Sequence, residues 1–171
     1  MATYQQLFNL CKKKFNISWL YGQSHANEKL FLTEKAKQYP TLCVGFLNII
    51  HPDRLHIIGP AEIEFFNQIS HDARIGFLQK LVDNKSLGLV VCLDLALPDD
   101  MIQPLIDTNL PVFGTSEPPE KVLTFVRHNI VKLLAPSCSM HGVFMDVFGM
   151  GILLSVSYTH LRAHETSAHL V

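Results

Sequence analysis

The chain has 171 residues, of which 48% are hydrophobic and only 17% are charged, and its formal net charge at pH 7 is −1. This length suits one domain with its own core, and the apolar content combined with a small net charge excludes a disordered chain. The chain lacks the excess of lysine and arginine that attracts nucleic acids and anionic membranes, so we expect neither as a partner. No apolar run approaches the length that crosses a bilayer.

Cysteine usage and the N-terminus bear on the cellular compartment. The four cysteines are far apart and form no Cys-x-x-Cys pair; they are Cys11, Cys43, Cys92 and Cys138. Such spacing is typical of reduced thiols and not of a disulfide framework or a thiolate metal site. The N-terminus has no basic segment followed by an apolar stretch, as a signal peptide has. We therefore expect a cytoplasmic protein.

Helical spacing of apolar side chains recurs along the chain. Residues 3–15 begin with a capping threonine and place apolar side chains on one face, which predicts a helix. Residues 29–38 are mixed and favour either a loop or a short helix. Further helices are expected at residues 62–69, 72–82, 98–106 and 118–134. Pro136 ends the last of them.

Short, nearly continuous apolar runs predict strands that are buried on both faces. The expected strands cover residues 17–21, 41–50, 54–58, 87–93 and 111–114. Strands separated by helices are typical of an α/β fold, so we predict a mostly parallel sheet of four or five strands with helices on both faces. Residues 139–154 then favour a hairpin, with strands at 140–147 and 152–154 and a turn or bulge at Gly149–Gly151.

Four stretches carry a resemblance to a known family. They are VGFLNIIHPDRLHIIGPAEIEFF (44–66), LGLVVCLDLALPDDM (87–101), PVFGTSEP (111–118) and APSCSMHGVFMDVFGMGILL (135–154). This text resembles the HPr kinase/phosphorylase family. The resemblance implies an N-terminal α/β regulatory or assembly domain at residues 1–134, similar in architecture to the nucleotide-sugar binding domains of Mur ligases. It also implies that residues 135–154 are a linker and the first strands of a C-terminal kinase domain.

The same resemblance implies a bifunctional enzyme. The family uses ATP and Mg²⁺ to phosphorylate a serine of the phosphocarrier protein HPr, uses inorganic phosphate to remove that group, and assembles as hexamers. In the family a strand like 151–154 leads into a phosphate-binding loop, Gly-x-x-x-x-Gly-Lys-Ser/Thr. No glycine of this chain is followed by lysine. We therefore expect a chain that stops before this loop, binds no nucleotide or metal and has no kinase activity alone.

One residue receives a catalytic role from the resemblance. His141 stands at the His-Gly position that in the family lies beside the nucleotide phosphates, where an imidazole can donate a hydrogen bond or positive charge to phosphate oxygens. The alternative for His141 is a structural histidine at the start of a strand. Asp146, in the same apolar stretch, is either an exposed or interface-facing aspartate or a buried catalytic acid.

Other polar groups leave two interpretations each. His51 and His56 fit a surface turn better than a metal pair, since no third ligand lies at fixed spacing. The run from Lys12 to Lys14 is either a phosphate patch or a solvated helix end, and Asp53 and Arg54 are candidates for contact with a ligand or another subunit.

The last residues have a different character from the rest of the chain. Residues 155–171 are rich in Ser, Thr and His, continue no strand pattern, and resemble translated adaptor sequence, so we interpret them as a non-native tail. A zinc-finger-like spacing combines Cys138 and His141 with His160 and His164, and half of it lies in this tail.

The alternative to the enzyme interpretation is a non-catalytic module for oligomerisation or for binding a small phosphorylated metabolite at the carboxyl ends of the strands. A product of gene calling with no cellular role is the remaining possibility.

Overall fold

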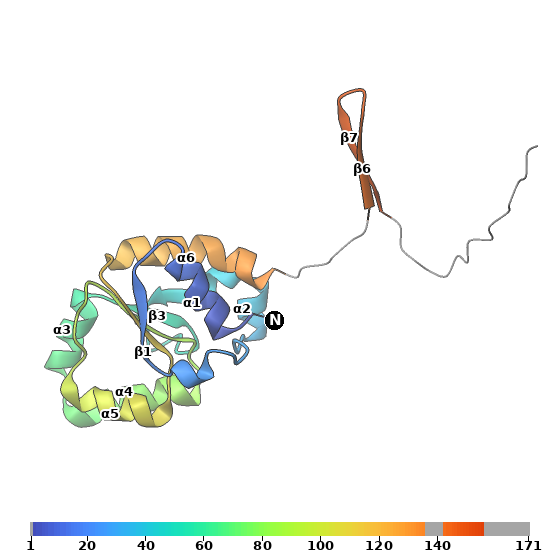
Figure 1. Ribbon diagram of the computed structural model, residues 1–171. Coiled ribbons are helices and arrows are strands. Elements are labelled where there is room, and N and C mark those ends of the chain that lie inside the picture. Colours follow the sequence, from blue (N-terminus) through green and yellow to red (C-terminus); the bar gives the residue numbers. More distant parts are fainter. Residues whose placement is uncertain (1, 136–141, 156–171) are drawn as a thin grey trace, which may run out of the picture. The chain divides into compact units, whose positions relative to one another are not determined.

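The computed structural model divides the chain into two compact units, Met1–Ala135 and Pro136–Val171. A five-stranded sheet forms the centre of the first unit (Figure 1). The structure describes residues 2–135 and 142–155. The strand order is β1-β5-β4-β3-β2, with β2 to β5 parallel and β1 antiparallel to β5. The strands are β1 (Ile17–Tyr21), β2 (Val44–Phe46), β3 (Leu55–Ile58), β4 (Gly88–Val91) and β5 (Val112–Thr115). The predicted mostly parallel α/β sheet is confirmed.

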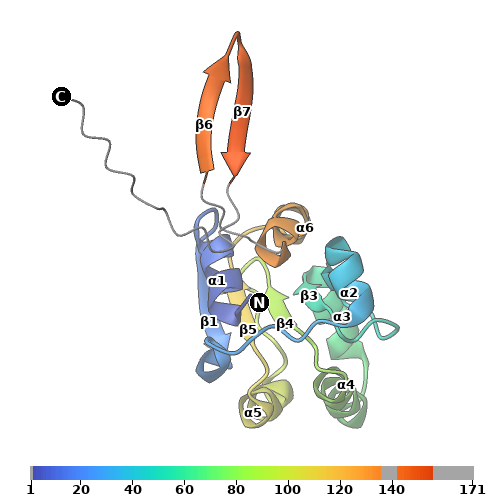
Figure 2. The ribbon, with the colours of Figure 1, turned by 90° about the vertical axis from the view of Figure 1, so that its right-hand side faces the viewer.

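Helices cover both faces of this sheet, as predicted. They are α1 (Tyr4–Lys12), α2 (Glu34–Gln38), α3 (Pro60–Gln68), α4 (His71–Asp83), α5 (Asp99–Thr108) and α6 (Pro119–Leu134), with 3₁₀ turns at Gln23–His25 and Pro40–Cys43. Figures 1 and 2 show α6 on one side of the strands and α4 and α5 on the other. No helix of the described residues is long and apolar enough to cross a membrane.

The core consists of two apolar layers, one on each face of the sheet. Side chains of α1 and α6, such as Leu7 and Val126, pack with Leu55 and Ile57 of β3. Side chains of α3, α4 and α5 pack on the opposite face with Ile58. Adjacent strand residues point to opposite faces, so a fully apolar strand contributes to both layers. This is why the central strands are continuous apolar runs in the sequence.

The strand predicted at residues 41–50 is much shorter than expected. Only Val44–Phe46 is a strand, and Pro40–Cys43 is a 3₁₀ turn. Beyond β2 the chain turns at Asn48, whose Oδ1 accepts a hydrogen bond of 2.8 Å from the Ile50 amide. Ile49 and Ile50 are therefore 54% and 80% exposed. The apolar run continues past the strand because it also lines a surface cleft, described below.

The predicted strand at 87–93 also ends early. Leu93 and Asp94 have φ of 58° and 51°, and the Leu95 amide donates to the Cys92 carbonyl over 3.2 Å, so the chain turns directly after β4. Loops then lead from the carboxyl ends of the parallel strands into α3, α5 and α6.

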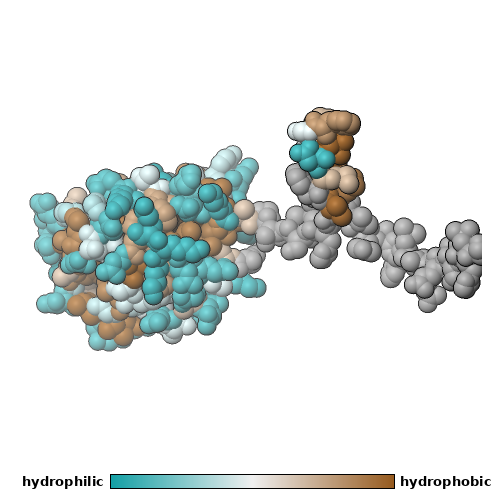
Figure 3. All heavy atoms as spheres, turned by 45° about the horizontal axis from the view of Figure 1, so that its top comes forward, coloured by the Kyte–Doolittle hydropathy of each residue, from teal (hydrophilic) through white to brown (hydrophobic). Residues whose placement is uncertain are grey.

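The second unit contains an antiparallel hairpin, β6 (Gly142–Val147) and β7 (Met150–Ser155). The turn or bulge predicted at Gly149–Gly151 lies slightly too late in the chain, because Phe148 and Gly149 form the turn and Gly151 pairs with Asp146 inside the ladder. Both turn residues have positive φ, 54° and 78°, which is the conformation of the two-residue turns that match strand twist. Much of the visible hairpin surface is hydrophobic (Figure 3), and the Phe148 side chain is 99% exposed.

Candidate functional site

The connection between β2 and β3 distinguishes one corner of the sheet. Parallel neighbours are normally joined by a crossover of a dozen or more residues, usually a helix. Here residues 47–54 make the connection without a helix. Since this loop is short, it does not fill the space beside α3 and α4, and a cleft remains at the carboxyl edge of β2 and β3.

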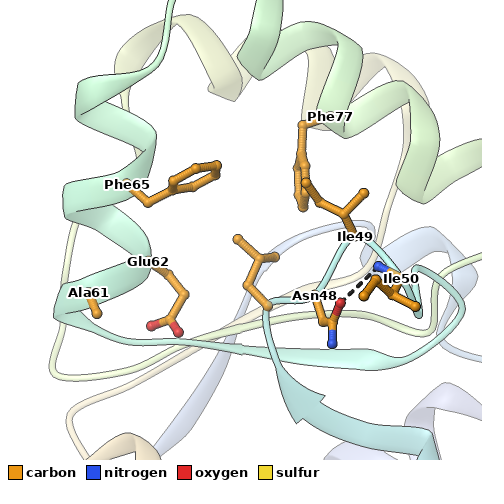
Figure 4. Close-up of a pocket in the computed structure, with 8 residues that line it drawn as sticks. Asn48, Ile49, Ile50, Ala61, Glu62, Phe65 and Phe77 are labelled. Carbon is orange, nitrogen blue, oxygen red and sulfur yellow. Dashed lines mark hydrogen bonds between the residues drawn. The ribbon is translucent and has the colours of Figure 1, made fainter.

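This cleft has a volume of about 450 Å³ and mainly apolar walls. Its lining residues are Leu47, Asn48, Ile49, Ile50, Ala61, Glu62, Phe65 and Phe77. Figure 4 shows the rings of Phe65, from α3, and Phe77, from α4, extending into the space between these helices, opposite the 48–50 loop. Phe65 is 39% exposed whereas Phe77 is buried, so Phe77 belongs to the base of the cleft and Phe65 to its rim.

The polar side chains of the cleft hold the backbone around it. Glu62 Oε2 accepts a hydrogen bond of 2.8 Å from the Gly59 amide, the capping arrangement at the start of α3. Asn48 fixes the loop through the Ile50 amide. Apolar walls with one carboxylate suit an apolar ligand or side chain and offer no donor cluster for phosphate.

Metal-ligand clusters and reactive thiols are two features that mark a catalytic site. Residues 2–135 and 142–155 contain no cluster of three or more His, Cys, Asp or Glu that could hold a metal ion. Burial raises the pKa of Cys11 and of Cys92 to about 12 and that of Cys43 to about 11. Protonated, enclosed thiols are poor nucleophiles, so these cysteines are structural.

The two histidines considered as a metal pair lie in different environments. His51 is partly exposed in the turn before β3, whereas His56 is fully buried within β3. The surface-turn interpretation is therefore wrong for His56, because β3 is an interior strand. His56 Nε2 lies 3.3 Å from the Pro52 carbonyl oxygen, and burial lowers the pKa of this imidazole. A neutral, enclosed histidine that holds its own loop has a structural role.

The remaining sequence candidates are spread over the surface. Lys12 is exposed and lies 5.7 Å from the centre of the Phe8 ring. Asp53 Oδ2 accepts a hydrogen bond of 3.3 Å from the Thr33 hydroxyl. Asp146 is exposed, and its Oδ1 accepts a hydrogen bond of 2.8 Å from the Gly149 amide, which stabilises the hairpin turn. Neither Lys12 nor Asp53 lines the cleft.

Comparison with known proteins identifies the family. The model described as "HPr Serine kinase N terminus" matches residues 4–130. The chain belongs to this family. HPr kinase/phosphorylase of Paraburkholderia phymatum is 31% identical over 153 residues, covering 88% of this chain and 47% of that protein. The same-named proteins of Xylella fastidiosa strain M12 and Xanthomonas axonopodis pv. citri are each 24% identical over 153 residues, covering 90% of this chain and 48% of theirs.

The chain thus spans about half the length of the HPr kinase/phosphorylases that it matches. His141, the residue with a predicted catalytic role, lies outside the described residues, and that role stays a prediction. The zinc-finger-like arrangement also lies outside them, since Cys138, His160 and His164 are not described.

The cleft residues were missed by sequence reasoning. Phe65 and Glu62 were interpreted only as part of a helix, and the isoleucines of the loop as part of a buried strand. Two signals were available: the short interval between the apolar run and the next strand, and the Glu62 carboxylate placed three residues after the Gly59 cap.

Proposed function

We propose that this chain is the N-terminal part of a bifunctional, cytoplasmic HPr serine kinase/phosphorylase that regulates bacterial carbohydrate metabolism. Residues 1–134 form its regulatory or assembly domain, 135–154 lead into the kinase domain, and 155–171 are a non-native tail. The whole enzyme uses ATP and Mg²⁺ to phosphorylate HPr, uses phosphate to reverse the reaction, and is a homo-oligomer. His141 contacts the nucleotide phosphates in that enzyme.

The family match over residues 4–130 carries this proposal. The names of the relatives support the kinase and phosphorylase activities, and the length of those relatives supports a catalytic half beyond this chain. Phosphoryl transfer depends on a loop that surrounds the phosphates, a lysine that reaches them and a metal-bound hydroxyl. No Gly-Lys pair occurs in the sequence. The chain alone therefore has no kinase activity.

A phosphorylation assay tests this assignment. The 171-residue chain is incubated with Mg-ATP and HPr, and phosphoserine is measured by mass spectrometry. HPr kinase/phosphorylase of Paraburkholderia phymatum is the positive control. We expect phosphoserine with the control and none with the chain. Phosphoserine formed by the chain at a rate above that of HPr alone would show that the argument from the missing loop is wrong.

The cleft favours a second candidate function, a ligand-binding module. Its apolar lining supports an apolar ligand over the phosphorylated metabolite expected from the sequence. Thermal-shift measurements with sugar phosphates, uridine nucleotides and small aromatic amines separate these classes, and a Phe65→Ala variant assigns any shift to the cleft. A saturable shift with a sugar phosphate that persists in that variant would exclude the cleft as its site.

A further inference from the structure

A second pocket lies at the amino ends of β4 and β5, at the edge of the sheet opposite to the cleft. It has a volume of about 240 Å³ and is formed by the carboxyl ends of α4 and α5, by Tyr4 at the start of α1 and by residues of the 25–31 segment. It shares no lining residue with the cleft. The proposed kinase reaction does not use this part of the chain.

Two residues that line this pocket have side chains where the backbone favours glycine. Lys85 follows α4 and Asn109 follows α5, with φ of 54° and 55°, and glycine is the usual residue in this left-handed conformation after a helix. Asn109 Nδ2 donates a hydrogen bond to the Ser24 hydroxyl. The Lys85 ammonium has no hydrogen bond or ion pair with the described residues and lies 4.4 Å from the centre of the Phe31 ring. Residues held in such conformations are frequent at ligand sites.

Two polar side chains of this pocket are available to a ligand. Tyr4 is only 7% exposed, yet its hydroxyl forms no hydrogen bond with the residues that the structure describes. Burial and the Glu28 carboxylate raise the pKa of Tyr4 to about 12, so the phenol stays protonated and can both donate and accept. Glu28 Oε2 lies 3.3 Å from His25 Nδ1, and the Glu28 side chain is 62% exposed. A nearly enclosed hydroxyl without a protein partner indicates a position for a polar group of a ligand.

The pocket contains both signs of charge in balance. Lys29 and Lys85 are positive and Glu28 is negative, and the carboxyl ends of α4 and α5 each add about half a negative charge. A ligand with one positive and one negative group therefore matches the pocket better than a simple anion or cation. The apolar part of the lining consists of Val82, Leu110, Pro111 and the Phe31 ring.

We propose that this pocket binds a free amino acid with an apolar side chain. The ammonium of the ligand lies toward Glu28 and the helix ends, and its carboxylate accepts hydrogen bonds from the two lysines and the Tyr4 hydroxyl. The apolar side chain contacts the Phe31 ring, which is 47% exposed and leaves the pocket open for entry. The proposal does not depend on the kinase assignment or on the cleft.

Ligands that lack one charge test the proposal. Isothermal titration calorimetry is carried out on the full 171-residue chain with L-leucine and L-phenylalanine, and with two leucine analogues. The analogue 3-methylbutylamine lacks the carboxylate, and 4-methylpentanoate lacks the ammonium. We expect saturable binding of at least one amino acid below about 10 mM, and binding of both analogues at least about tenfold weaker than that of leucine. No binding of either amino acid overturns the proposal, as does an analogue that binds as tightly as leucine.

Substitutions assign the binding to this pocket. Glycine favours the backbone conformation at position 85, so Lys85→Gly should be at least as stable as the wild type toward urea, while its affinity for the amino acid falls about tenfold or more. Tyr4→Phe, which removes only the hydroxyl, and Glu28→Gln, which removes only the charge, should also weaken binding. Lys132→Ala on α6 is the matched control and should retain wild-type affinity. Wild-type affinity in Lys85→Gly and Glu28→Gln would place the ligand elsewhere on the chain and overturn the proposal. A destabilised Lys85→Gly variant would overturn the argument from this position, because the fold would then need the lysine side chain.

Discussion

The surroundings of Gly88 and Gly76 predict opposite effects of alanine substitution on stability. Gly88 begins β4 with a φ of 113°, which L-residues rarely adopt, and a Cβ there would lie 2.3 Å from the Pro111 carbonyl oxygen. That oxygen accepts a hydrogen bond of 2.9 Å from the Leu89 amide, which ties β4 to the start of β5. Gly76 has neither constraint, since the space around it is open. Alanine at Gly88 therefore disrupts the sheet, whereas alanine at Gly76 favours its helix.

The magnitudes follow from these surroundings. At Gly88, the unfavourable φ costs about 1 to 3 kcal/mol, and moving the Pro111 oxygen away from the Leu89 amide costs about 1 kcal/mol more. We expect Gly88→Ala to lower the free energy of unfolding by about 3 kcal/mol, a large part of the roughly 5 to 15 kcal/mol typical of a domain. We expect Gly76→Ala to raise it by about 0.5 to 1 kcal/mol.

Equilibrium urea unfolding measures both effects. Trp19 of β1 is a suitable fluorescent reporter, because its ring centre lies 4.5 Å from that of Phe113 in β5 and so reports on the sheet. Low micromolar protein keeps association from contributing to the midpoint. A Gly88→Ala variant within 0.5 kcal/mol of the wild type, or a destabilised Gly76→Ala variant, would refute the reasoning from Cβ contacts.

Two further perturbations probe a buried histidine and a partly buried arginine. Burial lowers the pKa of His56, so this imidazole takes up a proton at higher pH in the unfolded chain than in the folded chain. The free energy of unfolding should therefore fall as the pH drops through the ordinary imidazole pKa of about 6.5. Urea titrations between pH 8 and pH 5 should show a shallower slope in His56→Leu, and equal slopes would contradict this account. The Arg74 guanidinium donates hydrogen bonds to the carbonyl oxygens of Phe66 and Ile69 over 2.7 Å each and to Asp100 Oδ2 over 2.8 Å. Lysine cannot form this set of hydrogen bonds, so Arg74→Lys should lower the free energy of unfolding by about 2 kcal/mol. A urea midpoint of Arg74→Lys equal to that of the wild type would show that these hydrogen bonds do not stabilise the fold.

Sequence reasoning predicted the sheet and its helices because burial on both faces produces unmistakable apolar runs. Strand β1 was predicted at its observed bounds, Ile17–Tyr21. The fold class followed from the alternation of strands and helices, and the order of the strands did not, since it depends on contacts between distant segments.

The errors occurred where apolar residues are not in the core. Ile49 and Ile50 continue the apolar run of β2 in the sequence, but the turn at Asn48 leaves their side chains exposed. Composition cannot separate an apolar side chain in a core from one that lines a cleft. His56 shows the converse, a polar residue of ordinary surface type that is enclosed by neighbouring strands.

The cleft exists because the connection between β2 and β3 is short, so it depends on the number of residues in this connection and not on their identity. An insertion of about ten residues at 47–54 would allow a crossover helix to form and occupy the space opposite Phe65 and Phe77. Relatives can therefore be sorted by the number of residues between these two strands before any side chain is compared. Those with longer connections should lack both the cleft and the exposed isoleucines at its mouth.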